Sequence, residues 1–159
     1  MGFDSRAFRD ILGQFATGVC VITSEGENVP AFGLTVNSFA SLSLDPPLVL
    51  WNLGKASDAW SRFENVDGYV VNILRESQQN TSMRFSKSGQ NNLQEGEWIE
   101  GQSGLPVLKQ VLGSIECKIA QRIDGGDHVI LVGEVIHLSR GDAGKPLLFF
   151  GGGYRELSS

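Results

Sequence analysis

A row of small polar side chains runs through a stretch that otherwise has the pattern of two apolar strands. The stretch extends from Gly33 to Leu50, and its polar side chains are those of Thr35, Asn37, Ser38, Ser41 and Ser43. A buried hydroxyl or amide without a hydrogen-bond partner costs roughly 1–3 kcal/mol, so five such groups in strands call for a polar ligand. A flat heterocycle with donors and acceptors around its rim, such as a flavin ring, would satisfy them without introducing charge.

The cysteines and histidines give little support for a disulfide, a metal site or a catalytic cysteine. Cys20 and Cys117 lie singly in apolar strand patterns with no CxxC spacing, and the only histidines are His128 and His137. We interpret each cysteine as a small buried apolar side chain and expect neither a disulfide nor a metal site. His137 is expected at the surface, whereas His128 follows a turn and is either a solvated turn residue or a functional one.

Composition narrows the class of protein. The chain has 159 residues, of which 41% are hydrophobic and 19% charged, with a net charge of −5. This length fits a single domain, residues 1–159, and scattered Lys and Arg argue against nucleic acid. No apolar run approaches the ~18 residues of a membrane span and no signal peptide is evident, so we expect a cytoplasmic protein without a membrane segment. A charged fraction below the usual ~25% suggests that a partner covers some of the surface.

Hydrophobic periodicity predicts mostly strands. A helix capped by Asp4 or Ser5 carries apolar residues at i, i+3, i+4 and i+7, ends near Gly18 and is interpreted as an amphipathic lid. Short helices are predicted over 57–63 and 77–85, with a long loop over 86–104. Strands are predicted over 19–23, 29–37, 48–52, 68–74, 115–123, 128–138 and 146–150.

The strand over 115–123 has the clearest alternation, with Ser114, Glu116, Lys118 and Arg122 expected on a solvated face. Six or seven strands, three short helices and no strand–helix alternation favour a small antiparallel barrel over a parallel sheet. The glycines offer no dinucleotide-binding fingerprint between a strand and a helix, so a nicotinamide cofactor would have to bind in another way.

Four blocks of the sequence, in order, resemble the short-chain flavin reductase family. They are Phe8–Val19, Thr35–Val49, Gly126–His128 and Pro146–Leu148, and the resemblance extends from about residue 8 to 155. The family comprises the NAD(P)H:flavin oxidoreductase components of two-component flavin monooxygenases. The resemblance implies a mainly β fold, an FMN-binding split β-barrel that is antiparallel and Greek-key-like with a few short helices. It also implies a homodimer that reduces FMN or FAD with NADH or NADPH.

The resemblance also implies a flavin site. The isoalloxazine wall would consist of Thr35, Val36, Asn37, Ser38 and Ser41, and the ribityl and phosphate surroundings of Trp51, Asn52, Lys55, Ala56 and Ser57. Phe85 would pack beside the flavin, and Arg84 or Lys87 could reach a pyrophosphate. A helix beginning near Ser57 would offer free N–H groups to a phosphate, and Lys55 would add a cation. Asp58 is a departure from the family pattern, because many relatives have a hydroxyl side chain at this position. Its carboxylate would repel a phosphate.

His128 falls on the block of the family that lies near the nicotinamide, and Tyr154 is a second candidate for the same pocket. Hydride transfer requires the donor carbon to be held about 3–3.5 Å from the flavin ring nitrogen, and the transfer itself needs no acid or base. We therefore expect His128, the candidate catalytic residue, to orient NAD(P)H.

The predicted function is reduction of FMN or FAD by NADH or NADPH, with reduced flavin passing by diffusion to a partner monooxygenase. Two alternatives remain open. One is a protein that holds flavin tightly as an electron carrier, and the other is a related split-barrel oxidase or ferric reductase.

Overall fold

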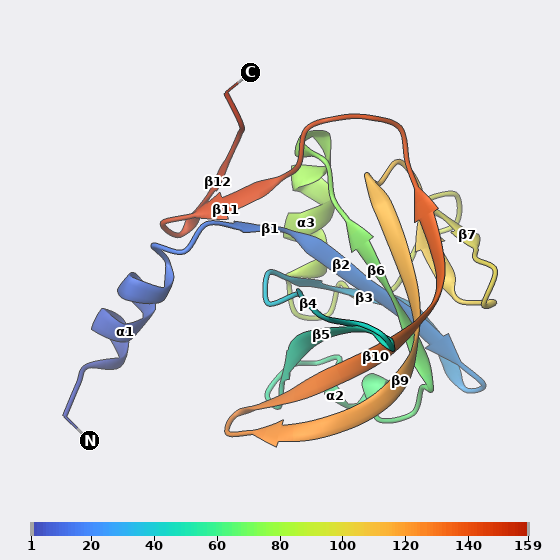
Figure 1. The fold of residues 1–159 in the computed structure, drawn as a ribbon, viewed down its shortest axis with the longest axis horizontal. Coiled ribbons are helices and arrows are strands. Elements are labelled where there is room, and N and C mark those ends of the chain that lie inside the picture. Colours follow the sequence, from blue (N-terminus) through green and yellow to red (C-terminus); the bar gives the residue numbers. More distant parts are fainter. Residues whose placement is uncertain (1, 159) are drawn as a thin grey trace.

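Antiparallel strands dominate the computed structural model, which describes residues 2–158 (Figure 1). The largest sheet has seven strands in the order β3-β2-β6-β9-β10-β5-β4. Their bounds are β2 (Cys20–Gly26), β3 (Val29–Val36), β4 (Ala40–Leu44), β5 (Pro47–Gly54), β6 (Gly68–Ile73), β9 (Gly113–Gly125) and β10 (His128–Arg140). The two edge strands, β3 and β4, follow each other in the chain, so the curled sheet is open between them. We call this opening the seam; it gives the split barrel that the sequence predicts.

The remaining elements flank this sheet. A three-stranded sheet contains β1 (Thr17–Gly18), β11 (Leu148–Phe150) and β12 (Gly153–Arg155), and a pair contains β7 (Trp98–Glu100) and β8 (Pro106–Leu108). The helices are α1 (Ser5–Leu12), α2 (Trp60–Phe63), the 3-10 turn η1 (Glu76–Gln78) and α3 (Gln79–Phe85). None of the helices in residues 2–158 combines the length and the apolar character needed to cross a membrane.

Two apolar clusters hold the sheet in place, one on each face of β2. Successive residues of a strand point to opposite faces. Cys20 and Ile22 therefore enter the cluster inside the barrel, whereas Val21 enters a second cluster beneath α3. In the first cluster the Trp51 ring packs edge-on against Phe63 and Tyr69, with ring centroids 4.9 and 5.7 Å apart. This packing fixes β5, the neighbour of the edge strand β4 that borders the seam.

The N-terminal helix stands away from the barrel (Figure 1). Asp4 caps α1 by accepting a hydrogen bond from the Arg6 N–H at 3.1 Å, and the helix ends at Leu12 rather than near Gly18. Gly13 at the C-cap donates its N–H to the Arg9 carbonyl, which ends the helix early. No residue of α1 is buried, so within a single chain the helix is not the lid that its amphipathic pattern predicts.

The polar side of β9 differs from the prediction. Ser114 and Glu116 are buried rather than solvated, and the turn over 101–105 covers Glu116. The Glu116 carboxylate accepts hydrogen bonds from the N–H and hydroxyl of Ser103 at 2.8 and 2.5 Å. The loop over 86–104 is therefore partly ordered, with β7 at its end.

Both cysteines are buried and free, as predicted. Burial raises the pKa of the Cys20 thiol to about 12 and, with the nearby charge of Glu116, raises the pKa of Cys117 to about 12. These thiols are structural and unreactive in the folded chain. No group of three or more potential metal-ligating side chains gathers within residues 2–158.

Candidate functional site

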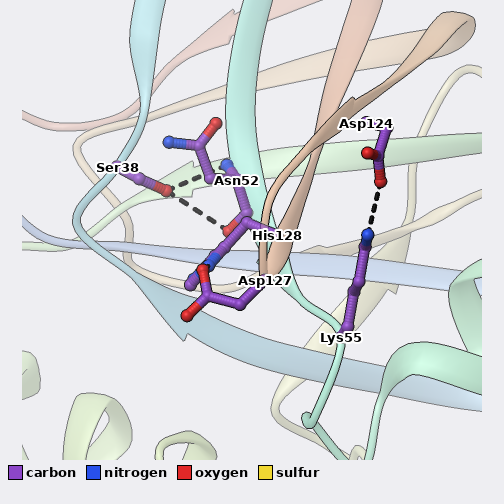
Figure 2. A network of polar contacts seen from close by, with 6 residues as sticks. All are labelled: Ser38, Asn52, Lys55, Asp124, Asp127 and His128. Atoms are coloured by element: carbon purple, nitrogen blue, oxygen red, sulfur yellow. Dashed lines mark hydrogen bonds and ion pairs between the residues drawn. The ribbon is translucent and has the colours of Figure 1, made fainter. Parts of the chain in front are cut away.

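The predicted polar row lies along the seam. Thr35 donates its hydroxyl proton to the Ser82 carbonyl at 2.7 Å, and the Ser38 hydroxyl accepts the Asn52 N–H at 3.0 Å (Figure 2). Asn37 and Ser41 are exposed. The row is therefore half-buried to exposed rather than buried in the core, because β3 and β4 are edge strands. Some of its members are satisfied within the chain, while others remain open to a ligand.

A first cavity of about 310 Å³ adjoins the end of β3. It is lined by Val19, Thr35, Val36, Asn37, Ser82, Ser86, Phe149 and Tyr154. The hydroxyls of Ser82 and Tyr154 lie 2.6 Å apart, so Thr35, Ser82 and Tyr154 join β3, α3 and β12 into one wall. The structure thus brings the predicted ring-binding residues of β3 together with Tyr154.

A second cavity, of about 210 Å³, continues from the first, since Ser86 lines both. It is lined by Leu34, Ala56, Ser57, Asp58, Phe85, Ser86, Lys87, Ser88 and Asn91. Phe85 is fully buried and belongs to the apolar cluster beneath α3. We call this second cavity the phosphate cavity, because it contains the predicted Ala56 and Ser57.

The local structure at the phosphate cavity corrects the predicted helix start. Helix α2 begins at Trp60, with Ala59 at its N-cap and no side-chain cap, so residues 57–59 form a turn. The Ser57 hydroxyl accepts the Ala59 N–H at 3.1 Å, which stabilises this turn. A four-residue helix supplies little dipole, so the helix-terminus argument for phosphate binding does not hold here.

Two of the three cations proposed for the phosphate are already paired. Lys55 pairs through Nζ with Asp124 (Figure 2), and its backbone N–H donates to the Asp127 carbonyl at 2.9 Å. It anchors the β9–β10 hairpin and does not line the cavity. Arg84 holds Glu97 through two bonds of 2.8 and 2.6 Å. Lys87 is the only cation among the described residues that line the phosphate cavity.

The Trp51 side chain lies in the core, which corrects its place in the predicted site. It is fully buried, because in β5 the odd residues Trp51 and Leu53 face the barrel interior. Asn52 and Gly54 face the other side. Only the backbone of Trp51 can contribute at the seam.

His128 begins β10 directly opposite Gly54 of β5. Its Nδ1 lies 2.7 Å from Asp127 Oδ1 (Figure 2). A methyl group placed on Gly54 would meet Nε2 at 3.5 Å. Hydrogen bonding to His128 and the charge of His128 lower the pKa of Asp127. An ionised Asp127 accepts a hydrogen bond from the N–H at Nδ1. This leaves Nε2 of the half-exposed ring free for a ligand.

An unsatisfied atom marks the wall between His128 and Ser38. Asn52 Oδ1 is buried and has no hydrogen-bond partner within residues 2–158. The Asn52 backbone N–H donates to the Ser38 hydroxyl, and Ile130, two residues beyond His128, pairs with Asn52 across the strands. A polar ligand with ring donors, such as a flavin, fits this wall and the open Asn37 and Ser41.

Sequence reasoning missed several residues at the site, chiefly Ser82, Ser86, Asn91 and Phe149. Asn91 pairs with the edge of β3 as a neighbouring strand would. Its side-chain amide donates to the Gly33 carbonyl, and its backbone carbonyl accepts the Gly33 N–H, both at 2.8 Å. A single asparagine in a polar loop gives no signal of this role. Ser82 reaches Thr35 only through the packing of α3 on β3.

An antiparallel split barrel with polar cavities along its seam defines a class of flavin-binding proteins. Residues 12–158 match the family described as Flavin reductase like domain, and the chain belongs to that family. The predicted resemblance is confirmed.

Relatives named for flavin reduction cover nearly all of the chain. FMN reductase (NADH) SmoA of Agrobacterium fabrum is 41% identical over 157 residues, which are 99% of this chain and 88% of that protein. The reductase subunit HsaB of a flavin-dependent monooxygenase from Rhodococcus jostii is 42% identical over 154 residues, 97% of this chain and 78% of that protein. The solved NADH:FAD oxidoreductase of Streptomyces globisporus, in complex with NAD and FAD fragments, is 34% identical with a TM-score of 0.90, covering 98% of this chain and 93% of that one.

Proposed function

We propose that the chain is an NAD(P)H-dependent flavin reductase that reduces FMN or FAD and supplies reduced flavin to a separate monooxygenase. The observation that carries this proposal is the pair of cavities that meet at Ser86 along the seam. They offer an elongated polar site next to β3 with a cation, Lys87, in the second cavity. The names of the relatives support the same activity and the monooxygenase partner.

Bound flavin would supply a ring nitrogen that accepts hydride from the nicotinamide. The chain's own part is positioning, since holding two reactants in the correct geometry can supply several kcal/mol of the barrier reduction. Thr35, Val36, Asn37, Ser38 and Ser41 would hold the ring, and Ala56 and Ser57 the phosphate-bearing tail. His128, kept in one orientation by Asp127, would direct Nε2 toward the carboxamide end of NAD(P)H.

The activity is tested by mixing the pure chain with NADH or NADPH and with FMN or FAD, and following the loss of nicotinamide absorbance. We expect oxidation of the nicotinamide with at least one pair of substrates. The absence of oxidation above background with every pair would refute the proposal. Flavin that survives desalting, together with slow nicotinamide oxidation, would instead indicate an electron carrier.

We also propose that the chain forms a homodimer. Helix α1 has eight residues and no buried side chain. Its large apolar residues Phe8, Ile11 and Leu12 are 50, 71 and 56% exposed. A helix this short is marginal in water without tertiary packing, so a second copy of the chain is its expected cover. Leu44 on the edge strand β4 and Leu138 on β10 are also exposed, at 96 and 69%.

Light scattering at micromolar concentration tests this state, and a monomeric mass would overturn it. A cytoplasmic location is part of the same proposal, because free thiols and a nicotinamide donor both suit a reducing compartment.

A further inference from the structure

Two turns face each other across the phosphate cavity and are joined by one carboxylate. Residues 56–58 form one wall of the cavity and residues 85–88 contribute to another. Asp58 Oδ2 accepts the Gly89 N–H at 3.0 Å and also accepts a hydrogen bond from the Ser88 hydroxyl. Hydrogen bonds to an ionised acceptor are stronger than those between neutral groups. Asp58 therefore connects the turn over 86–89 to the opposite wall.

Between its fixed ends, the turn over 86–89 has little other support. Its remaining hydrogen bonds are local and include those from the Ser86 hydroxyl to the Met83 carbonyl at 2.7 Å, from the Lys87 N–H to the Arg84 carbonyl at 3.1 Å and from the Gln90 N–H to the Lys87 carbonyl at 3.3 Å. All its residues are exposed, and Gly89 has a φ of +78°, which suits a sharp reversal of the chain. Without the Asp58 contact, nothing in the hydrogen-bond pattern ties this turn to residues 56–58.

The same turn carries the cation of the phosphate cavity. Lys87 lines the cavity, whereas Lys55 and Arg84 are engaged by Asp124 and Glu97. The place of Lys87 therefore depends on the turn; Phe85 and Asn91 fix the two ends of the turn, and Asp58 is the side chain that holds its middle against residues 56–58. This reverses the expectation that the Asp58 charge acts mainly by repelling a phosphate.

We propose that Asp58 is a positioning residue for the phosphate of the flavin, because it holds the 86–89 turn so that Lys87 and Ser86 face that phosphate. The inference rests on the proposed function and deepens it. It concerns the phosphorylated tail only, and it assigns no contact between Asp58 and the flavin ring.

Titrations with FMN and with riboflavin separate the tail from the ring. Both are followed by flavin fluorescence in wild type, Asp58→Ala and Glu64→Ala, an exposed control that removes one charge nearby and lines no part of the cavity. We expect Asp58→Ala to weaken FMN binding about tenfold, since one lost hydrogen-bonded contact is worth about that factor, and to leave riboflavin binding within about twofold. Glu64→Ala should change neither affinity.

Two further variants probe the two bonds separately. Ser88→Ala removes one bond from the opposite side of the contact, and Asp58→Asn keeps an oxygen that can accept the Gly89 N–H. Both should lower the ratio of FMN to riboflavin affinity by less than Asp58→Ala does. They also serve if Asp58→Ala fails to fold, which circular dichroism would show.

Three outcomes would overturn the assignment. FMN binding that tightens selectively in Asp58→Ala and Asp58→Asn would mean that repulsion dominates. Equal weakening of FMN and riboflavin would mean a general structural role, and an unchanged ratio would mean no role. If wild-type protein binds neither flavin, the proposed function fails together with the role of Asp58. The three outcomes above would overturn only the role of Asp58 and leave the proposed function intact.

Discussion

At the scale of single residues, His128 offers the sharpest test of how the nicotinamide is oriented. Its ring lies against Gly54 and is held through Nδ1 by Asp127, outside both cavities beside β3. We expect His128→Ala to raise the KM for NAD(P)H about tenfold, the value of one lost polar contact, and to slow flavin reduction. Flavin affinity should stay nearly unchanged. Steady-state kinetics and a flavin fluorescence titration measure the two effects.

His137→Ala is the matched control for this experiment. His137 lies on the same strand, β10, but pairs with Glu116 of β9 rather than facing Gly54. It should leave the KM unchanged. Kinetics of His128→Ala that equal those of wild type would show that His128 is only a turn residue.

Single residues also show where sequence reasoning ends. Family resemblance predicted Thr35, Asn37 and Ser57, and the structure places each of them at the wall of a cavity or in a turn beside one. The pairing of Lys55 with Asp124 could not be predicted, because the two residues lie 69 positions apart and meet only when β10 pairs with both β5 and β9. Strict attention to strand alternation would have placed Trp51 in the core beside Leu53.

At the scale of elements, α1 is the part of the chain whose role depends most on a second copy. Replacing Phe8 and Ile11 by serine removes two exposed apolar side chains without breaking any contact with the barrel core. If the helix packs on another protomer, each buried side chain contributes roughly 1.5–3 kcal/mol, so the double variant should weaken dimerisation about 100-fold or more. Sedimentation over a range of concentrations measures this constant.

Arg6→Ser is the control for the helix experiment, since Arg6 is exposed and only its backbone N–H meets the cap Asp4. It should leave the association constant unchanged. An unchanged constant in the double variant would show that α1 is not part of the dimer interface.

Most of the longer elements were predicted within a few residues, because hydrophobic periodicity marks them. The short strands β1, β4, β7, β8 and β12 were not predicted, since none is longer than five residues. Errors gathered where long-range contacts decide the structure. The predicted helix over 57–63 shortens to Trp60–Phe63, since Ser57 caps a turn instead of a helix. Glu116 turns inward because a distant loop supplies its hydrogen-bond donors, which no local pattern encodes.

At the scale of the whole molecule, the two buried thiols report global opening. Cys20 lies on β2 and Cys117 on β9, and both belong to the same core cluster. Because burial raises the pKa of each thiol to about 12, neither forms a thiolate in the native state at neutral pH. We expect both to react with a thiol reagent only when the barrel opens, so that labelling follows unfolding.

Mass spectrometry during labelling in increasing urea tests this expectation, with fully unfolded protein as the reference for complete reaction. Rapid modification of either cysteine without denaturant would contradict it.

The barrel as a class could be predicted, but its strand order could not. Counting strands and excluding strand–helix alternation favours an antiparallel barrel. The order β3-β2-β6-β9-β10-β5-β4 depends on which distant strands pair, such as β6 with β9, and periodicity carries no such information. The position of the seam therefore emerges only from the folded chain.

The seam leaves part of the outer edge of β3 without a strand neighbour. Residues Asn91 and Leu93 bond to Gly33 and Ala31 and so cover the outer edge of β3 there, while the order of the sheet gives Leu34–Val36 no strand neighbour on that side. Uncovered strand edges are where chains join one another and aggregate. If flavin binds along this edge and leaves it in each catalytic cycle, the edge is uncovered once per turnover, and solubility during turnover would then depend on how quickly the next flavin arrives.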